Sequence, residues 1–230
     1  MPKYIDRPML HPKGFDEAIE LPYGLRASEI KAAIDDIYDF LYTMNKFMVE
    51  HGWERLEETL SAATFSGVIS ELFVAGVSKR SATIIANQYH NGRPDLIPRG
   101  VYPDDKCPRG DEGIEVKASR RSAGWQGHNK ESGWLMMCQY SVDIGTEPAS
   151  EREPTRVVRV LCARLDESDW SFSGRKEGSR RTPTATISKV KLIASVVYLE
   201  PAYGAAPSKK KEAVEAEIVA RDEGSPEQQA

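Results

Sequence analysis

The 230-residue chain has few cysteines and no long apolar run. Its three cysteines, Cys107, Cys138 and Cys162, are widely spaced and lack a second ligand set at zinc-site intervals, which excludes a disulfide framework and a zinc knuckle. No segment approaches the roughly 20 apolar residues of a membrane span, and no apolar core follows the opening residues. We therefore expect a soluble protein of the reducing cytoplasm that is neither exported nor membrane-embedded.

An excess of positive charge is also missing, because 31 Lys and Arg face 35 Asp and Glu, for a formal net charge of -4. This balance argues against nonspecific binding of polyanions by the whole surface. The charge is unevenly placed, however. Residues 16–71 carry twelve acidic against four basic side chains, whereas residues 152–191 carry ten basic against five acidic ones. We expect a basic C-terminal half with a face that can approach phosphates, with ordinary solvated charge as the alternative.

The length and the 40% hydrophobic content support one domain of ordinary size. Residues 1–26 mix Pro, Gly and charge without periodicity, which predicts an extended arm that packs through Tyr4, Phe15 and Tyr23. Four segments follow from these changes in composition: an arm at 1–26, a helical region at 27–90, a core with the sheet at 91–204, and a disordered tail at 205–230.

Apolar residues recur at three- and four-residue spacing from Ser28 to about His51, which predicts a long amphipathic helix. The pattern indicates further helices at 53–64, 66–75 and 78–87, before Asn91-Gly92 ends the helical region.

Apolar and β-branched runs after the helical region predict strands at 95–99, 113–119, 134–142 and 156–164. Residues 182–188 and 191–199 can form further strands or helices, of which we favour strands. A mixed sheet behind helices, an α/β (α+β) fold with a helical N-terminal part, follows from this order.

Three polar residues stand at the ends of two of these strands. Side chains alternate along a strand, so Glu115 and Lys117 project from the same side of Ile-Glu-Val-Lys-Ala. If Asp95 ends the neighbouring strand beside them, two carboxylates can hold a hard divalent cation and the ammonium can orient a water near a phosphate. Such a site would cut phosphodiester bonds. The alternative is structural, with Asp95 capping a turn and Glu115 paired to Lys117 or to a neighbouring arginine.

Pro94-Asp95, the 19 residues that follow and Glu115-x-Lys117 resemble the PD-(D/E)xK nuclease superfamily, which includes the type II restriction endonucleases. The resemblance covers roughly residues 60–145. It implies a restriction-endonuclease-like mixed central sheet flanked by helices. It also implies one or two Mg²⁺ ions held by Asp95 and Glu115, and Lys117 as the residue that orients or deprotonates the attacking water.

Members of that superfamily often carry a glutamate on an upstream helix. Glu71 lies in the middle of an apolar helical stretch, where an unpaired carboxylate is costly to bury. By resemblance it is a catalytic residue and a third metal ligand. The alternatives are an ion pair with Lys79 or Arg80, or a solvated helix face.

Two polar loops are candidates for DNA contacts, although any polar surface loop would look similar. The first follows the Glu-x-Lys strand and the second is cationic and glycine-containing. The expected DNA-binding residues are Arg120, Arg121, Gln126, His128, Asn129 and Lys130 in the first loop, and Arg175, Lys176, Arg180 and Arg181 in the second.

The sequence thus predicts a Mg²⁺-dependent type II restriction enzyme that cuts double-stranded DNA at a specific site without a nucleotide cofactor. A palindromic target would require a homodimer, and the long helix at 28–51 offers an interface. Two alternatives stay open: a repair or modification-dependent nuclease of the same superfamily, and a noncatalytic DNA-binding or assembly protein. The noncatalytic protein would bind DNA without Mg²⁺-dependent cutting.

Overall fold

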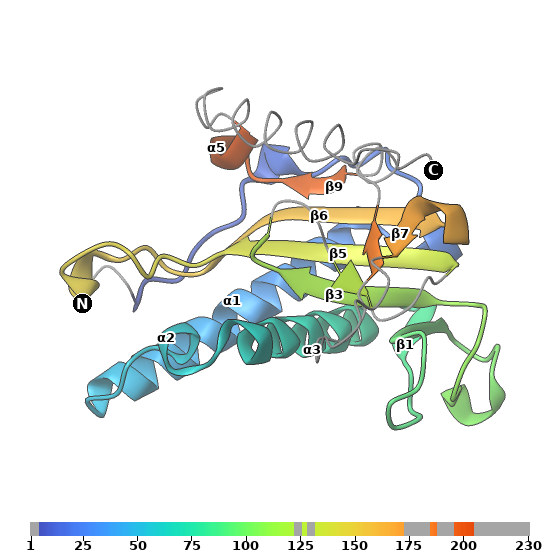
Figure 1. Ribbon diagram of the computed structural model, residues 1–230, viewed down its shortest axis with the longest axis horizontal. Coiled ribbons are helices and arrows are strands. Elements are labelled where there is room, and N and C mark those ends of the chain that lie inside the picture. Colours follow the sequence, from blue (N-terminus) through green and yellow to red (C-terminus); the bar gives the residue numbers. More distant parts are fainter. Residues whose placement is uncertain (1–4, 122–125, 128–131, 173–184, 188–195, 205–230) are drawn as a thin grey trace, which may run out of the picture.

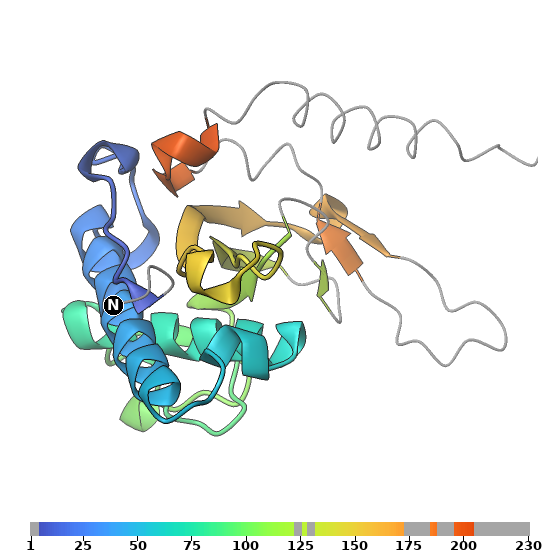
Figure 2. The ribbon, with the colours of Figure 1, turned by 90° about the vertical axis from the view of Figure 1, so that its left-hand side faces the viewer.

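A six-stranded mixed sheet with helices on one face forms the centre of the protein (Figure 1). The computed structural model describes residues 5–121, 126–127, 132–172, 185–187 and 196–204. Helices α1 and α3 cover one face of the sheet, which Figure 2 shows from the side. This architecture confirms the mixed α/β fold with a helical N-terminal part.

The helices are α1 (Ala27–Glu50), α2 (Leu56–Thr59), α3 (Ala62–Arg80) and α5 (Pro201–Gly204). Short 3-10 turns occur at Pro12–Gly14, Pro22–Gly24, Pro103–Asp105, Ala149–Glu151 and Glu167–Asp169. Helix α1 confirms the predicted amphipathic helix, because its apolar stripe is buried in the core.

Two helix predictions were wrong in their extent. The helix expected at 53–64 is reduced to the single turn of α2, and α3 is longer than predicted because Ser61 caps it by accepting a hydrogen bond from the Thr64 amide. The helix expected at 78–87 does not form. Helix α3 ends at Arg80, and the β-branched residues that follow form strand β1 (Ile84–Ala86) instead.

The sheet has the order β1-β2-β3-β5-β6-β9, and only the β3–β5 pair among these neighbours is parallel. The remaining strands in it are β2 (Leu96–Pro98), β3 (Ile114–Ser119), β5 (Gly133–Ser141), β6 (Arg156–Leu165) and β9 (Val196–Leu199). A second, three-stranded sheet contains β4 (Gln126–Gly127), β8 (Ala185–Ile187) and β7 (Trp170–Phe172). The strands predicted in the central sheet are confirmed, whereas the separate second sheet was not expected.

Strands β5 and β6 are buried on both faces. The main core lies between the sheet and the helices and contains Phe65, Phe73 and Val116. A smaller core on the opposite face contains Leu135 and Trp170. Two buried faces explain why the sequences of β5 and β6 read as almost continuous apolar runs.

The N-terminal arm packs on the sheet. The Phe15 ring lies 4.5 Å from the Tyr198 ring on β9, and Phe15 and Tyr23 both contact the main core, which confirms their predicted packing. Tyr4 and the tail at 205–230 lie outside the described residues.

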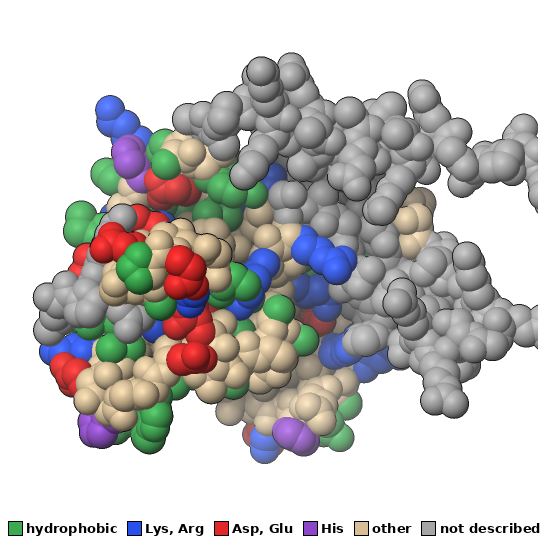
Figure 3. Space-filling model, turned by 60° about the vertical axis from the view of Figure 1, so that its left-hand side comes forward, with side chains coloured by type: hydrophobic (Ala, Val, Ile, Leu, Met, Phe, Trp, Pro, Cys, Tyr) green, Lys and Arg blue, Asp and Glu red, His purple; other side chains and the backbone are tan. Residues whose placement is uncertain are grey.

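Charged side chains are grouped on the surface. In the face shown in Figure 3, Asp and Glu side chains gather on one part of the surface, and a separate group of Lys and Arg side chains lies apart from them. Across the described part of the chain, no helix has the length and apolarity needed to cross a membrane.

Candidate active site

The pairing of β2 with β3 brings the predicted acids together. The strands are antiparallel with Leu96 opposite Ile114, so Asp95 and Glu115 come from adjacent backbone positions. The Val116 amide donates a hydrogen bond of 2.7 Å to Asp95 Oδ2, which fixes this carboxylate against β3. The register therefore places Asp95 at the end of the neighbouring strand, as the motif requires.

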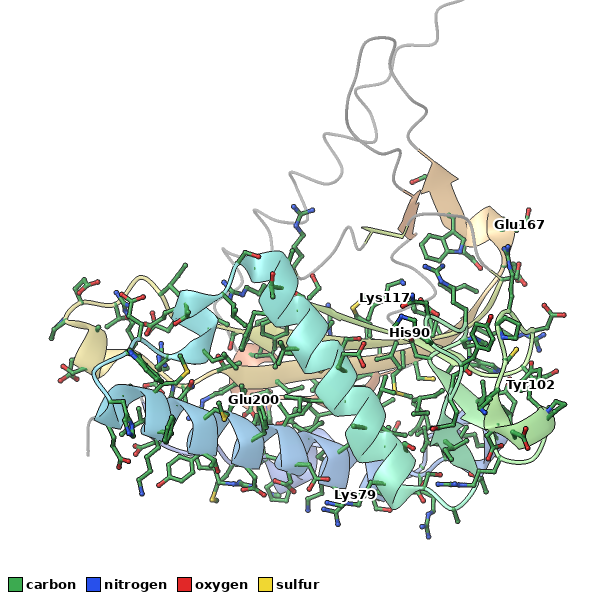
Figure 4. All side chains as sticks on the ribbon, turned by 90° about the horizontal axis from the view of Figure 1, so that it is seen from below. Lys79, His90, Tyr102, Lys117, Glu167 and Glu200 are labelled. Atoms are coloured by element: carbon green, nitrogen blue, oxygen red, sulfur yellow. The ribbon has the colours of Figure 1, made fainter. Side chains whose placement is uncertain are left out.

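Strand β3 alternates as its sequence predicts. Ile114 and Val116 are buried in the main core, whereas the side chains of Glu115 and Lys117 are 17% and 23% exposed. Lys117 Nζ donates a hydrogen bond of 2.9 Å to Glu115 Oε1. Figure 4 shows Lys117 at the same end of the molecule as Tyr102 and Glu167.

The surroundings of Asp95 disfavour its charged form. Burial and the negative charge of Glu115 raise its pKa to about 6, although the Val116 amide and the ammonium of Lys117 act in the opposite direction. The pair of acids thus has more negative charge than its one lysine neutralises. A raised carboxylate pKa with a named charge partner is typical of functional sites.

Glu71 lies on α3 with an exposed side chain, and its charge adds to the rise in the Asp95 pKa. Helix α3 is tied to β3 beside it, because Ser70 Oγ donates a hydrogen bond of 3.3 Å to the Val116 carbonyl. Within the described ranges, no three or more His, Cys, Asp or Glu side chains are grouped closely enough to hold a metal ion. Glu71 therefore does not form a three-carboxylate group with Asp95 and Glu115 in this arrangement.

The donor set nonetheless fits Mg²⁺. This ion prefers oxygen ligands and is usually held by one or two carboxylates, with water and substrate phosphates completing its shell. Asp95 and Glu115 supply two carboxylates, and the raised pKa of Asp95 is the effect that a nearby cation would relieve. Asp95 and Glu115 are therefore the two side chains that could hold such an ion.

The loop between β2 and β3 is held rigidly. Tyr102 Oη accepts a hydrogen bond of 2.9 Å from the Glu112 amide and donates one of 3.1 Å to the Glu112 carbonyl. Tyr23 Oη accepts a hydrogen bond of 2.8 Å from the Gly113 amide and donates one of 2.8 Å to Glu112 Oε2. Gly113 has φ +144°, and a Cβ there would lie 2.4 Å from the Leu96 carbonyl, so the approach to Glu115 requires glycine.

A cleft of about 420 Å³ opens beside the site. It is lined by Glu115 itself, by the loop at 108–113, by the start of β5 and by residues at the end of β6 and the start of β7. The acid of β3 is therefore accessible from a cavity and is not closed off inside the sheet.

Few of the predicted DNA-contacting residues are described. Arg120 is partly buried: its guanidinium lies 5.7 Å from the Phe65 ring centroid and 5.9 Å from that of Tyr140, and it donates to the Glu57 carbonyl. Arg121 is exposed, and Gln126 lies in β4. Outside the described residues lie His128, Asn129, Lys130, Arg175, Lys176, Arg180 and Arg181.

Sequence reasoning missed Arg93 and Arg109. The backbones of these two arginines form a parallel bridge, and both residues line the cleft. The signal in the sequence that could have pointed to these arginines is their closeness along the chain to Asp95 and Glu115.

The comparisons with known proteins leave the family open. A scan against protein-family models, a search of curated proteins and a search of solved structures each gave no match. The chemistry of the site thus rests on the arrangement of its own residues.

Proposed function

We propose that this protein is a Mg²⁺-dependent endonuclease that hydrolyses phosphodiester bonds of double-stranded DNA. The observation that carries the proposal is the position of Asp95 beside the Glu115–Lys117 pair, of which Glu115 lines an open cleft. Two carboxylates and a lysine on adjacent strands supply what metal-assisted hydrolysis of a phosphodiester needs from a protein. The resemblance of Pro94-Asp95 and Glu115-x-Lys117 to the PD-(D/E)xK superfamily supports the same chemistry.

Each residue has a distinct role in this proposal. Asp95 and Glu115 would hold the cation, which when bound neutralises phosphate charge and lowers the pKa of the attacking water. Lys117, positioned by its 2.9 Å contact with Glu115 Oε1, orients or deprotonates that water. Asp95 is held against β3 by the hydrogen bond from the Val116 amide, which fixes this carboxylate in advance of metal binding.

Sequence-specific restriction in the cytoplasm is the biological role that we propose, by resemblance to type II restriction enzymes. A symmetric target calls for two copies of the site related by a two-fold axis. Helix α1 is the proposed homodimer interface, because Phe40 and Phe47 on it are 37% and 48% exposed.

The test is a cleavage assay on purified protein. Unmethylated and modified phage DNA are incubated with Mg²⁺ or EDTA, beside Asp95→Ala and Lys117→Ala. Asp104→Asn and Lys106→Ala are matched controls, since both are exposed charged residues of the same loop that do not line the cleft. We expect discrete fragments with wild type and the controls, and at least about a 100-fold slower reaction in the two site variants.

Absence of cutting on every substrate would overturn the proposal. Retained DNA binding in that case would identify a noncatalytic DNA-binding protein. Cutting of modified DNA alone would identify a modification-dependent nuclease that uses the same residues.

A further inference from the structure

The cleft beside Glu115 has the size and walls of a small-molecule site. Its volume of about 420 Å³ lies within the range of roughly 300 to 1,000 Å³ that ligand pockets occupy. Trp134 and Trp170 line it together with Leu135 and Leu165. Leu135, Leu165 and Trp170 are buried in the smaller core beneath the cleft, whereas Trp134 is partly exposed and offers an aromatic face that suits a planar ring.

Four charged residues surround the apolar walls. Arg93, Arg109 and Asp111 come from the segments around β2 and β3, and Glu167 comes from the turn before β7. All four are exposed. The cleft therefore offers hydrogen-bond donors and acceptors along one rim.

The backbone that carries these groups is fixed, although it lies at the surface. The Arg93 amide donates to the Pro108 carbonyl at 3.3 Å, and the Gly110 amide donates to the Arg93 carbonyl at 2.9 Å. Tyr102 and Tyr23 pin the loop on the other side of Asp111. A surface loop held at both ends keeps the backbone positions of these residues fixed, which lowers the backbone entropy lost on binding.

We propose that this cleft binds one guanine base of the DNA, turned out of the double helix close to the bond that is cut. The inference rests on the proposed function for the identity of the substrate. Because Glu115 belongs to both the cleft and the catalytic group, a base in the cleft comes from a nucleotide near the reacting phosphate.

The charges of the cleft favour a base over a backbone phosphate. Three carboxylates (Asp111, Glu115 and Glu167) face two guanidinium groups, so a phosphate anion meets a surplus of like charge. A neutral base does not meet this repulsion.

Among the four bases, guanine can form hydrogen bonds with both the arginines and the carboxylates of the cleft. Its O6 and N7 accept a bidentate pair of hydrogen bonds from arginine, and its N1–H and N2–H donate to a carboxylate. Adenine is best matched by Asn or Gln, neither of which lines the cleft among the residues that the structure describes. Stacking on Trp134, which is partly exposed, would replace the base stacking lost from the duplex.

The experiment measures DNA binding by fluorescence anisotropy in EDTA, so that no cleavage is required. One duplex is fully paired, a second carries a single unpaired guanine, and a third carries an unpaired thymine. Turning a base out of a duplex costs a few kcal/mol, and an unpaired base avoids most of this cost. We expect wild type to bind the guanine bulge about tenfold more tightly than the paired duplex, and the thymine bulge with much less preference.

Two exposed cleft residues provide the variants. Arg109→Ala and Asp111→Asn should each abolish the preference for the guanine bulge, whereas Lys106→Ala, which removes a positive charge from the same loop outside the cleft, should retain it. Equal binding of the three duplexes by wild type, or a preference that survives both cleft variants, would overturn the proposal.

The outcome is separable from that of the nuclease proposal. Preference for the guanine bulge without Mg²⁺-dependent cutting would support the cleft and refute the nuclease. Cutting without that preference would support the nuclease and refute the cleft.

Discussion

Two clusters of charged side chains in this protein differ in their balance of positive and negative charge. Near α2, Arg55 is fully buried and contacts Glu57 Oε1 at 3.4 Å and Glu58 Oε1 at 3.2 Å, and Arg152 also contacts Glu58 Oε1, at 2.5 Å. Near the β2–β3 pair, one lysine serves two neighbouring acids. The two clusters lie toward different ends of the sheet (Figure 1).

The pKa values in the two clusters move in opposite directions. Burial alone would raise the pKa of Glu58, but its contacts with Arg55 and Arg152 outweigh burial and lower it. Burial and the charge of Glu115 raise the pKa of Asp95 to about 6. A cluster in which each charge has its partner holds the fold together, whereas we propose that the cluster with excess negative charge binds a cation.

The largest expected effect comes from breaking the balanced cluster. We expect Arg55→Met to lower the free energy of unfolding by about 3 to 5 kcal/mol, because Glu57 would stay buried without its cation and Glu58 would keep only Arg152. Urea denaturation checks this. Arg26→Met is the control, since the Arg26 side chain is 69% exposed and its ion pair with Glu29 is worth at most about 1 kcal/mol. Equal losses in the two variants would contradict the comparison.

The second prediction concerns the cluster of Asp95, Glu115 and Lys117, where we expect a substitution to raise the free energy of unfolding. The folded-state pKa of Asp95 is raised from 3.8 to about 6, so its contribution to stability is present below pH 4 and is lost as the pH rises through 6. In metal-free protein at pH 8, Asp95→Asn should therefore stabilise the fold by up to about 3 kcal/mol, and the increase should vanish near pH 4.

Asp143→Asn provides the contrast for this measurement. Amide hydrogen bonds from Glu153, Thr146 and Gly145 outweigh burial and lower the pKa of Asp143 to about 2. This variant should be less stable than wild type at neutral pH. A destabilised Asp95→Asn protein at pH 8 would contradict the account of that site.

Sequence pattern was sufficient to predict β3 and the shared face of its two polar side chains, Glu115 and Lys117. The alternation of Ile-Glu-Val-Lys-Ala places Glu115 and Lys117 on one face whatever the neighbouring strand is. Helix α3 shows the limit of periodicity. Its apolar residues are spread around the helix and do not form a single stripe. Its start at Ala62 and its end at Arg80 could therefore not be located from the periodicity of the sequence.

The two clusters could not be told apart from the sequence. Glu54-Arg55-Leu56-Glu57-Glu58 looks like a solvated charged face, and its burial depends on contacts with residues about 90 positions away, such as Asp143 and Glu153. The cleft depends likewise on the turn at Glu167 meeting the loop at 108–113. Contacts of this kind belong to tertiary structure, which local patterns do not encode.

The third prediction separates two adjacent arginines. Arg120 packs over Phe65 and Tyr140, so Arg120→Ala should lower the free energy of unfolding by about 1 to 2 kcal/mol. Exposed Arg121→Ala should change it by less than about 0.5 kcal/mol. Thermal denaturation of both variants checks this, and a greater loss in Arg121→Ala would show that the packing of Arg120 contributes little.

The smallest expected effect is on the loop that carries the cleft. Tyr102→Phe removes the hydroxyl that bonds the Glu112 amide and carbonyl, which should cost about 1 kcal/mol and speed hydrogen exchange at Glu112. Tyr89→Phe, at an exposed tyrosine of the neighbouring segment, is the control and should leave that exchange unchanged. Unchanged exchange in Tyr102→Phe would show that the loop is ordered by other contacts.

The most direct measurement of the central claim is an NMR titration of the Asp95 carboxyl group with and without Mg²⁺. The account predicts a midpoint near pH 6 in metal-free protein, because of burial and Glu115, and a clear fall when Mg²⁺ is added. A midpoint near the ordinary aspartate value that Mg²⁺ does not move would contradict the claim that these acids await a cation.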